Sequence, residues 1–239
     1  MAGAALIRSV ERKPAPAHEL RSYPLNIPAI AGLQSLPLDP RVTILVGENG
    51  SGKSTLVEGI AVAAGLNAEG GSANFNFSSH SQIPELARHL RLIRGARRPT
   101  DGFFLRAESF FNVASEAERL AVPGLSGLHR RSHGEAFLDL VTNRFRAGGL
   151  YVLDEPEAAL SPQGCINLML RIHQLVEASA QFLIATHSPI LMAFPGAAIH
   201  VLTDSGPTPS RFEDLAHVRL TRDFLAHPES YVRHLLAGA

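Results

Sequence analysis

The chain has 239 residues, of which 45% are hydrophobic and 18% charged, a composition typical of one globular unit with a single substantial core. Its 22 basic and 22 acidic residues cancel, so no overall charge attracts nucleic acid or an anionic membrane. The single cysteine, Cys165, excludes an internal disulfide framework and fits a reducing, cytoplasmic compartment. Charged residues interrupt the short apolar start, and prolines interrupt the apolar stretch 181–202. We therefore expect neither a secretory leader nor insertion into a membrane.

The first 40 residues give only weak signals. Residues 1–20 are small, charged and broken by prolines, so we expect a tail or a first edge strand. Tyr23 precedes the most informative stretch of the chain. Its ring could stack on a purine base, or it could simply pack beside Pro24, and the sequence leaves both alternatives open.

A buried strand followed by a glycine-rich loop is the most specific pattern in the chain. The run 42–46 is apolar and β-branched, and residues 47–54 match G-x-x-x-x-G-K-[ST], the phosphate-binding loop. In this loop Lys53 is expected to reach the β- and γ-phosphates, and Ser54 to hold Mg²⁺. A helix over 54–64, ending at Gly65, would direct its positive N-terminus at the phosphates. The predicted nucleotide-binding residues are Gly47, Glu48, Asn49, Gly50, Ser51, Gly52, Lys53, Ser54 and Thr55.

The middle of the chain alternates between expected strands and helices. Residues 72–78 read as a short strand, 78–100 as a polar segment and then a helix, and 102–111 as a strand with Glu108 late in it. The arginines at 88–98 could form a phosphate or nucleic-acid patch, but a solvated or salt-bridged helix face is favoured. Residues 112–147 look helical, and Ser132 with Glu135 forms a capping box, which explains that pair without any function.

A second cluster of polar residues follows two buried strands. The run 150–154 ends at Asp154, and two more carboxylates, those of Glu155 and Glu157, follow it at once. Like charges at the end of a buried strand are favourable only beside a cation, which Lys53 and Mg²⁺ would supply. Asp154 is then expected in the Mg²⁺ shell and Glu155 beside the attacking water.

The chain then continues with a helix from Ser161 and Pro162 to about residue 180 and a strand over 181–186. That strand ends at His187, at the sheet edge where ligands collect. A short strand over 199–202 and a helical piece over 211–239 complete the chain.

Taken together, these motifs resemble the ATP-binding-cassette ATPases. More closely, the chain is similar to small stand-alone bacterial ATPases of that class, AAA-type ATP-binding proteins with a P-loop. The resemblance rests on the following residues: 46–55, 74–77, 102–111, 132–135, 153–162 and 185–190.

The resemblance implies a role for each matching residue. Ser132 and the Gly134 N–H would contact the γ-phosphate of ATP bound to a second copy, and the loop 158–161 would cross the dimer interface. Glu155 would be the catalytic base, and His187 would bridge Glu155 and the γ-phosphate. Two ATP molecules would lie between the subunits of a head-to-tail homodimer.

The sequence departs from the class pattern in three ways. The usual Leu-Ser-Gly-Gly-Gln is replaced by Arg131-Ser132-His133-Gly134-Glu135, which is closer to chromosome-maintenance and DNA-repair relatives. The glutamine expected near Mg²⁺ could be Gln82, or its place could be taken by Glu108. Long coiled-coil heptads are absent from 78–148, which argues against a full chromosome-maintenance architecture.

We therefore expect an α/β P-loop NTPase of ATP-binding-cassette type, with a mostly parallel sheet flanked by helices and a small helical subdomain. Residues 1–239 would form one domain, with the nucleotide-binding core at about 1–77 and 149–239 and the helical subdomain at about 78–148. The expected activity is Mg²⁺-dependent hydrolysis of ATP to ADP and phosphate, of the non-transporter type. The alternatives are an ATP-gated dimerisation switch that recruits DNA or a protein, and the ATPase subunit of a membrane transporter.

Overall fold

A six-stranded sheet forms the centre of the protein in the computed structural model, which describes residues 4–67, 85–108, 110 and 133–237. The strand order is β5-β6-β7-β3-β8-β9. The first five of these strands run parallel, and β9 returns antiparallel to β8. The strands are β3 (Val42–Val46), β5 (Gly102–Arg106), β6 (Leu150–Asp154), β7 (Gln181–Ala185), β8 (Ala198–Thr203) and β9 (Gly206–Ser210).

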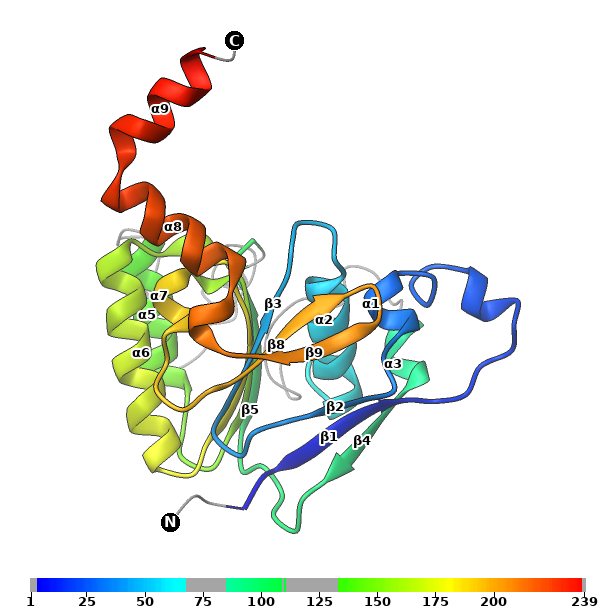
Figure 1. Ribbon diagram of the computed structural model, residues 1–239. Helices are drawn as coiled ribbons and strands as arrows, with labels where there is room; N and C mark the ends of the chain where they lie inside the picture. The colour runs from blue at the N-terminus through cyan, green and yellow to red at the C-terminus, as the bar shows by residue number, and fades with distance from the viewer. Residues whose placement is uncertain (1–3, 68–84, 109, 111–132, 238–239) are drawn as a thin grey trace.

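Both faces of this sheet are covered, which explains why β3, β6 and β7 are apolar at nearly every position (Figure 1). Alternate residues point to opposite sides. Ile44 joins the apolar cluster under α5 (His133–Arg144), α6 (Pro162–Glu177) and α7 (Pro189–Met192). Its neighbour Leu45 joins the cluster under α2 (Lys53–Ala64) on the other face.

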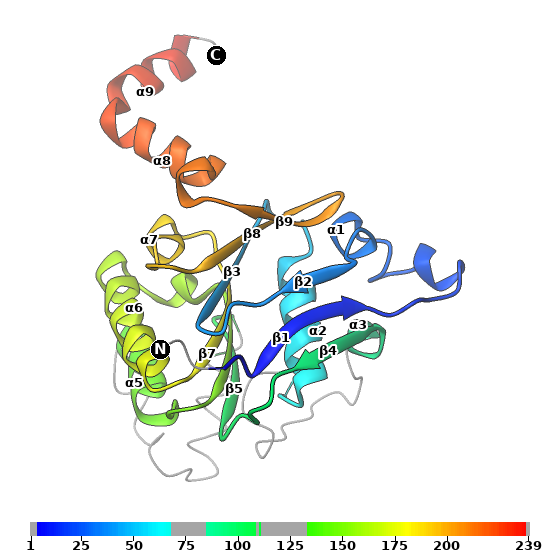
Figure 2. The same ribbon diagram turned by 60° about the horizontal axis from the view of Figure 1, so that its bottom comes forward.

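A smaller antiparallel sheet lies beyond α2, in the order β2-β1-β4 (Figure 2). Its strands are β1 (Ile7–Arg12), β2 (Ser35–Pro37) and β4 (Leu90–Arg94), and α1 (Pro28–Ala31), α3 (Glu85–His89) and the 3₁₀ turn η1 (Glu19–Arg21) lie beside it. The buried amide of Gln181 connects the two sheets. Its Oε1 accepts hydrogen bonds from the N–H groups of Leu6 (2.9 Å) and Ile7 (2.8 Å).

Two expectations for the smaller sheet were wrong. The N-terminal strand is not an edge strand, because β1 lies between β2 and β4. In the described part of the segment expected to end as a helix before residue 100, only α3 is helical, and β4 follows it directly. Pairing with β1 determines the strand, in which Arg91 lies opposite Glu11.

Local signals at helix ends are confirmed. Helix α2 ends at Gly65, which adopts the left-handed conformation with φ 93°. Helix α6 begins as expected, with Pro162 in its first turn and the Ser161 hydroxyl accepting a hydrogen bond from the Gly164 N–H at 3.1 Å. Of the helix expected over 112–147, the described part is α5, and residues 111–132 lie outside the described ranges together with the strand expected at 72–78.

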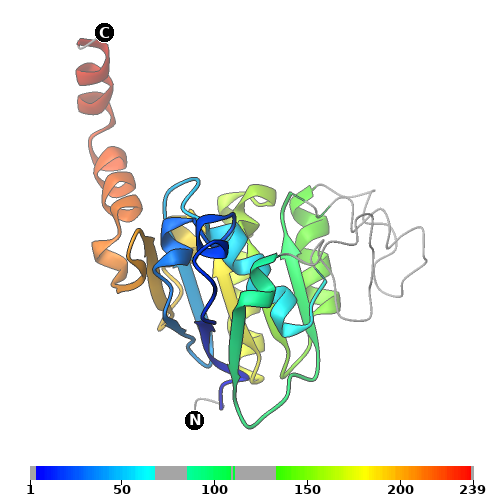
Figure 3. The same cartoon turned by 90° about the vertical axis from the view of Figure 1, so that its right-hand side faces the viewer.

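The C-terminal segment projects from the body as α8 (Ala216–Ala226) and α9 (Pro228–Ala237), after the 3₁₀ turn η4 (Phe212–Asp214) (Figure 3). We call α8 and α9 the arm. Six of the nine exposed large hydrophobic residues in the described part of the chain belong to it: Leu220, Phe224, Leu225, Val232, Leu235 and Leu236. None of the helices in the described residues has the length and apolar character needed to cross a bilayer.

Candidate active site

The loop between β3 and α2 has the geometry of a phosphate cradle. Gly50 and Gly52 have φ angles of 80° and 91°, a backbone region that side chains rarely allow. A Cβ on Gly52 would also lie 2.8 Å from the Ile27 side chain. These two positions therefore require glycine, and the turn they make directs the N-terminus of α2 at the space above the loop.

Lys53 lies across this loop. Its Nζ donates hydrogen bonds to the carbonyl oxygens of Gly47 (2.9 Å) and Glu48 (3.0 Å), and the residue is 4% exposed. Burial lowers the pKa of Lys53, while the negative charges of Glu155 and Asp154 act to raise it. The ammonium group is thus held at the mouth of the cradle, where anionic oxygens can replace the loop carbonyls as acceptors.

The parallel strands β3, β6 and β7 bring their carboxyl ends to the same edge of the sheet, so residues far apart in the sequence meet there. Asp154 at the end of β6 accepts a hydrogen bond from the Ser54 hydroxyl on Oδ1 (3.1 Å). Its side chain is only 3% exposed, and burial raises its pKa. Ser54 and Asp154, predicted from two separate motifs, therefore form one oxygen-donor pair beside the cradle.

Glu155 follows Asp154 in a left-handed backbone conformation, with φ 48°. A non-glycine residue rarely adopts this region, and such strain is concentrated at functional positions. The turn carries the Glu155 carboxylate away from the sheet into a cavity of about 370 Å³, whose lining also includes Lys53, Ser54 and Thr55. Glu155 is therefore placed on the same cavity as the phosphate loop.

His187 lies opposite Glu155, directly after β7. Its Nε2 is 3.5 Å from a Glu155 carboxylate oxygen, yet among the described residues this buried nitrogen has no partner in hydrogen-bond geometry. Burial, followed by the charge of Lys53, lowers the pKa of His187. Glu157 holds the turn by accepting from the His187 and Ser188 N–H groups at 2.5 and 3.1 Å. A phosphate oxygen beside Glu155 would give this nitrogen the partner that it lacks.

Sequence reasoning missed Arg106, which also reaches this edge. It lies opposite Asp154 in the β5–β6 register, and its Nε donates to Asp154 Oδ2 at 3.0 Å. Its Nη2 donates to Glu58 of α2 at 2.7 Å, and its guanidinium lies 5.5 Å from the centre of the Phe104 ring. The predicted strand placed Arg106 near its end, but only the pairing with β6 reveals its partner.

The remaining predicted residues have different outcomes. Tyr23 is 66% exposed and lines the same cavity as Lys53 and Thr55, which favours the stacking alternative over packing beside Pro24. Gly134 lies in the first turn of α5, where a Cβ would be 3.3 Å from the Ala159 carbonyl oxygen. Glu108 is exposed, two residues beyond Arg106. Ser132 and Gln82 lie outside the described residues.

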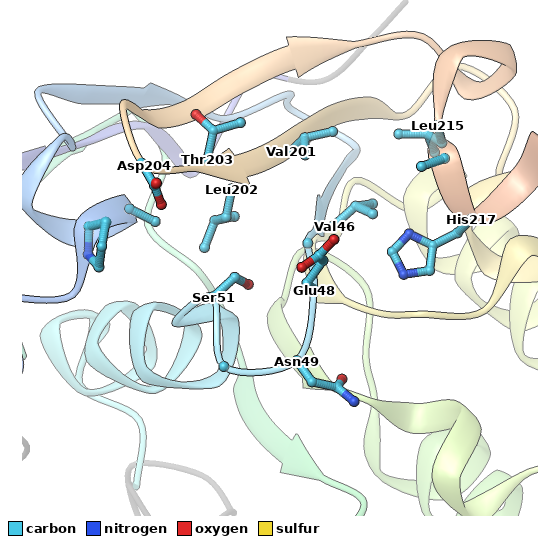
Figure 4. A pocket seen from close by; sticks show the side chains of 15 residues that line it. Val46, Glu48, Asn49, Ser51, Val201, Leu202, Thr203, Asp204, Leu215 and His217 are labelled. Carbon is cyan, nitrogen blue, oxygen red and sulfur yellow. The ribbon is translucent and has the colours of Figure 1, made fainter.

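A second cavity, of about 430 Å³, lies on the other side of the phosphate loop (Figure 4). Its walls are the loop from Glu48 to Ser51, the end of β8 with the adjoining turn, and the start of α8. Figure 4 shows the imidazole of His217 extending from α8 toward the side of the loop that carries Glu48. The arm therefore begins directly beside the candidate active site.

Comparison with known proteins supports the class that the phosphate loop indicates, the P-loop NTPases. Residues 18–97 match the family model of an AAA domain. Among solved structures, cbiO1 from Clostridium perfringens, described as part of the ABC transporter complex cbiONQ, is 16% identical, with a TM-score of 0.51 over 98% of this chain and 99% of that chain. No curated protein matches the sequence.

Two further structures are similar at a lower level. The SMC head domain from Thermotoga maritima is 14% identical over 86% of this chain and 99% of that chain, with a TM-score of 0.46. An ATP-binding cassette from an ABC transporter is 17% identical over 75% and 85%, also with a TM-score of 0.46. The likeness to cbiO1, together with the phosphate loop, establishes that this chain has the P-loop NTPase fold of the ATP-binding-cassette class.

Proposed function

We propose that the protein binds ATP with Mg²⁺ and hydrolyses it to ADP and phosphate. The observation that carries this proposal is that Lys53 and Glu155 line one cavity at the carboxyl edge of the sheet, with His187 Nε2 3.5 Å from the Glu155 carboxylate. Three separate segments of the sequence supply these groups. Phosphoryl transfer to water requires a cation for the phosphates, a base for the water and a hydrogen-bond donor for the γ-phosphate, and Lys53, Glu155 and His187 provide them in that order.

The residues divide the work as follows. The loop N–H groups and Lys53 bind the phosphates, and the exposed ring of Tyr23 provides a surface for the adenine. Ser54 and Asp154 would hold Mg²⁺, which would neutralise negative charge on the phosphates. The Glu155 carboxylate accepts a proton from the attacking water, and the His187 Nε2–H donates to the γ-phosphate.

The test compares variants at Glu155 and at the two lysines. Glu155→Gln keeps the side-chain shape but loses the base, so kcat should fall by about 10²- to 10⁴-fold while ATP binding persists. Lys53→Ala should lose ATP binding. Lys13→Ala is the matched control, because Lys13 lies away from the cavity and donates to the Arg88 carbonyl. Wild-type turnover in Lys53→Ala would contradict the assignment.

We further propose that the active form is a head-to-tail, non-transporter homodimer in the cytoplasm, with two ATP molecules between its subunits. Glu155→Gln should then form an ATP-dependent dimer, measured by light scattering. A mixture of Lys53→Ala and Ser132→Arg subunits should recover one working site in two. A monomer at saturating ATP would refute the dimer, and absence of recovery would refute the action of Ser132 across the interface.

An ATP-gated switch is the second candidate, and the apolar surface of the arm favours it. Monomers rarely expose such a concentration of large hydrophobic residues without a partner. A switch would show slow basal turnover, and its Glu155→Gln variant would remain bound to the partner. In a working ATPase, Glu155→Gln would instead stop the hydrolytic cycle. Double-stranded DNA is one partner to test. Stimulation of ATPase activity that disappears in Arg91→Glu/Arg94→Glu would identify it.

A further inference from the structure

His187 has two ring nitrogens in different surroundings. Nε2 lies 3.5 Å from the Glu155 carboxylate, whereas Nδ1 lies 3.4 Å from Nε2 of His217. The two rings meet edge to face, with centroids 5.4 Å apart and planes at 60°. Glu155, His187 and His217 thus form a line that runs from the proposed reacting centre to the start of α8.

The state of His187 follows from its surroundings. Burial and the charge of Lys53 lower its pKa, so the ring is neutral near pH 7 and carries one proton. A proton on Nε2 allows donation to Glu155 or to a phosphate oxygen, whereas a proton on Nδ1 leaves Nε2 as an acceptor facing anions. The proposed reaction therefore needs the Nε2–H tautomer.

The position of His217 is determined by the body of the protein. Leu215, two positions before it, and Val218, directly after it, are 2% and 4% exposed and belong to the main apolar cluster. Arg219 connects the first turn of α8 to η4, because its side chain donates hydrogen bonds to the Glu213 carbonyl (3.0 Å) and to the Asp214 carboxylate (2.6 Å). His217 is therefore held at its place beside His187 although the rest of the arm projects outward.

The geometry points to His217 as a positioning residue, whose Nε2–H donates to Nδ1 of His187 and so keeps the proton of His187 on Nε2. This inference rests on the proposed function, because it assigns the control of a group in that same site. The side chain at position 217 must therefore be a neutral hydrogen-bond donor. A carboxylate at this position would instead accept from Nδ1–H and stabilise the wrong tautomer.

The test uses three substitutions of different hydrogen-bonding capacity. His217→Gln offers an amide N–H, so it should keep kcat within about threefold of wild type. His217→Leu offers no donor, and its kcat should fall about 10- to 100-fold with little change in KM for ATP. His217→Glu should be at least as impaired as His217→Leu. His227→Leu is the matched control, because His227 follows α8 and its imidazole interacts with the exposed Asp223 rather than with the site.

A second readout does not depend on activity. Imidazole ¹⁵N chemical shifts distinguish protonated from unprotonated ring nitrogens, and the signals of His187 are identified by their loss in His187→Gln. Without nucleotide, wild type and His217→Gln should show the Nε2–H tautomer of His187, and His217→Glu should show Nδ1–H. An unchanged tautomer in His217→Leu and His217→Glu, or an unchanged kcat in both, would overturn the inference. An inactive wild-type protein with the expected tautomers would instead refute the proposed function alone.

Discussion

Arg106→Met should destabilise the protein strongly, because it leaves a buried carboxylate without its cation. The Asp154 side chain is 3% exposed, and Arg106 donates to it at 3.0 Å while also binding Glu58 at 2.7 Å. Removing one partner of a fully buried ion pair costs about 3–5 kcal/mol. The Arg106 and Glu58 side chains are 24% and 27% exposed, so we expect the lower end, about 3 kcal/mol.

Urea unfolding followed by circular dichroism, in EDTA and without nucleotide, measures this loss in the free energy of unfolding. Arg91→Met is the matched control. Arg91 also forms a cross-strand pair, with Glu11, but its side chain is 65% exposed, so its loss should cost less than about 1 kcal/mol. Adding Asp154→Asn to Arg106→Met should restore part of the stability, because the uncompensated charge is then gone. Equal costs for the two arginine variants, or no recovery in the double variant, would refute the reasoning.

Three further predictions concern a buried histidine, the exposed ring of Tyr23 and the strained backbone at Glu155. Burial lowers the pKa of His200, so its contribution to stability is present above about pH 6.5 and is lost as the pH falls toward its folded pKa, by at most about 1.4 kcal/mol per unit; thermal melts at pH 7.5 and 5.5 should show a smaller drop for His200→Gln. Tyr23→Ala should weaken ATP binding by about 1 kcal/mol in calorimetric titration, whereas Tyr23→Phe should not. Glu155→Asn should relieve the left-handed backbone and raise the free energy of unfolding by about 0.5–1 kcal/mol while abolishing ATPase activity. Ser179→Gly, at the other left-handed non-glycine residue of the described chain, should leave activity intact, and equal loss of activity in both variants would contradict a special role for Glu155.

Local patterns in the sequence determined much of the site. The phosphate loop could be predicted because its glycines, lysine and serine act within eight consecutive residues, and the helix behind it has its own stop signal at Gly65. The strands before Asp154 and His187 could be predicted because burial on both faces leaves a continuous apolar run that ends abruptly in polar residues. The fold class follows from the order of these elements along the chain.

Only the tertiary structure decided which side chains meet. Arg106 reaches Asp154, 48 residues away, because β5 pairs beside β6. His187 meets His217, 30 residues away, because α8 packs against α7, the helix that follows β7. The same holds for β4, which pairs with β1 where the sequence predicted a helix. A sequence pattern reports how one segment buries its own apolar face. The partner of a polar side chain depends on strand order and on the packing of helices between segments, and neither is encoded in local periodicity.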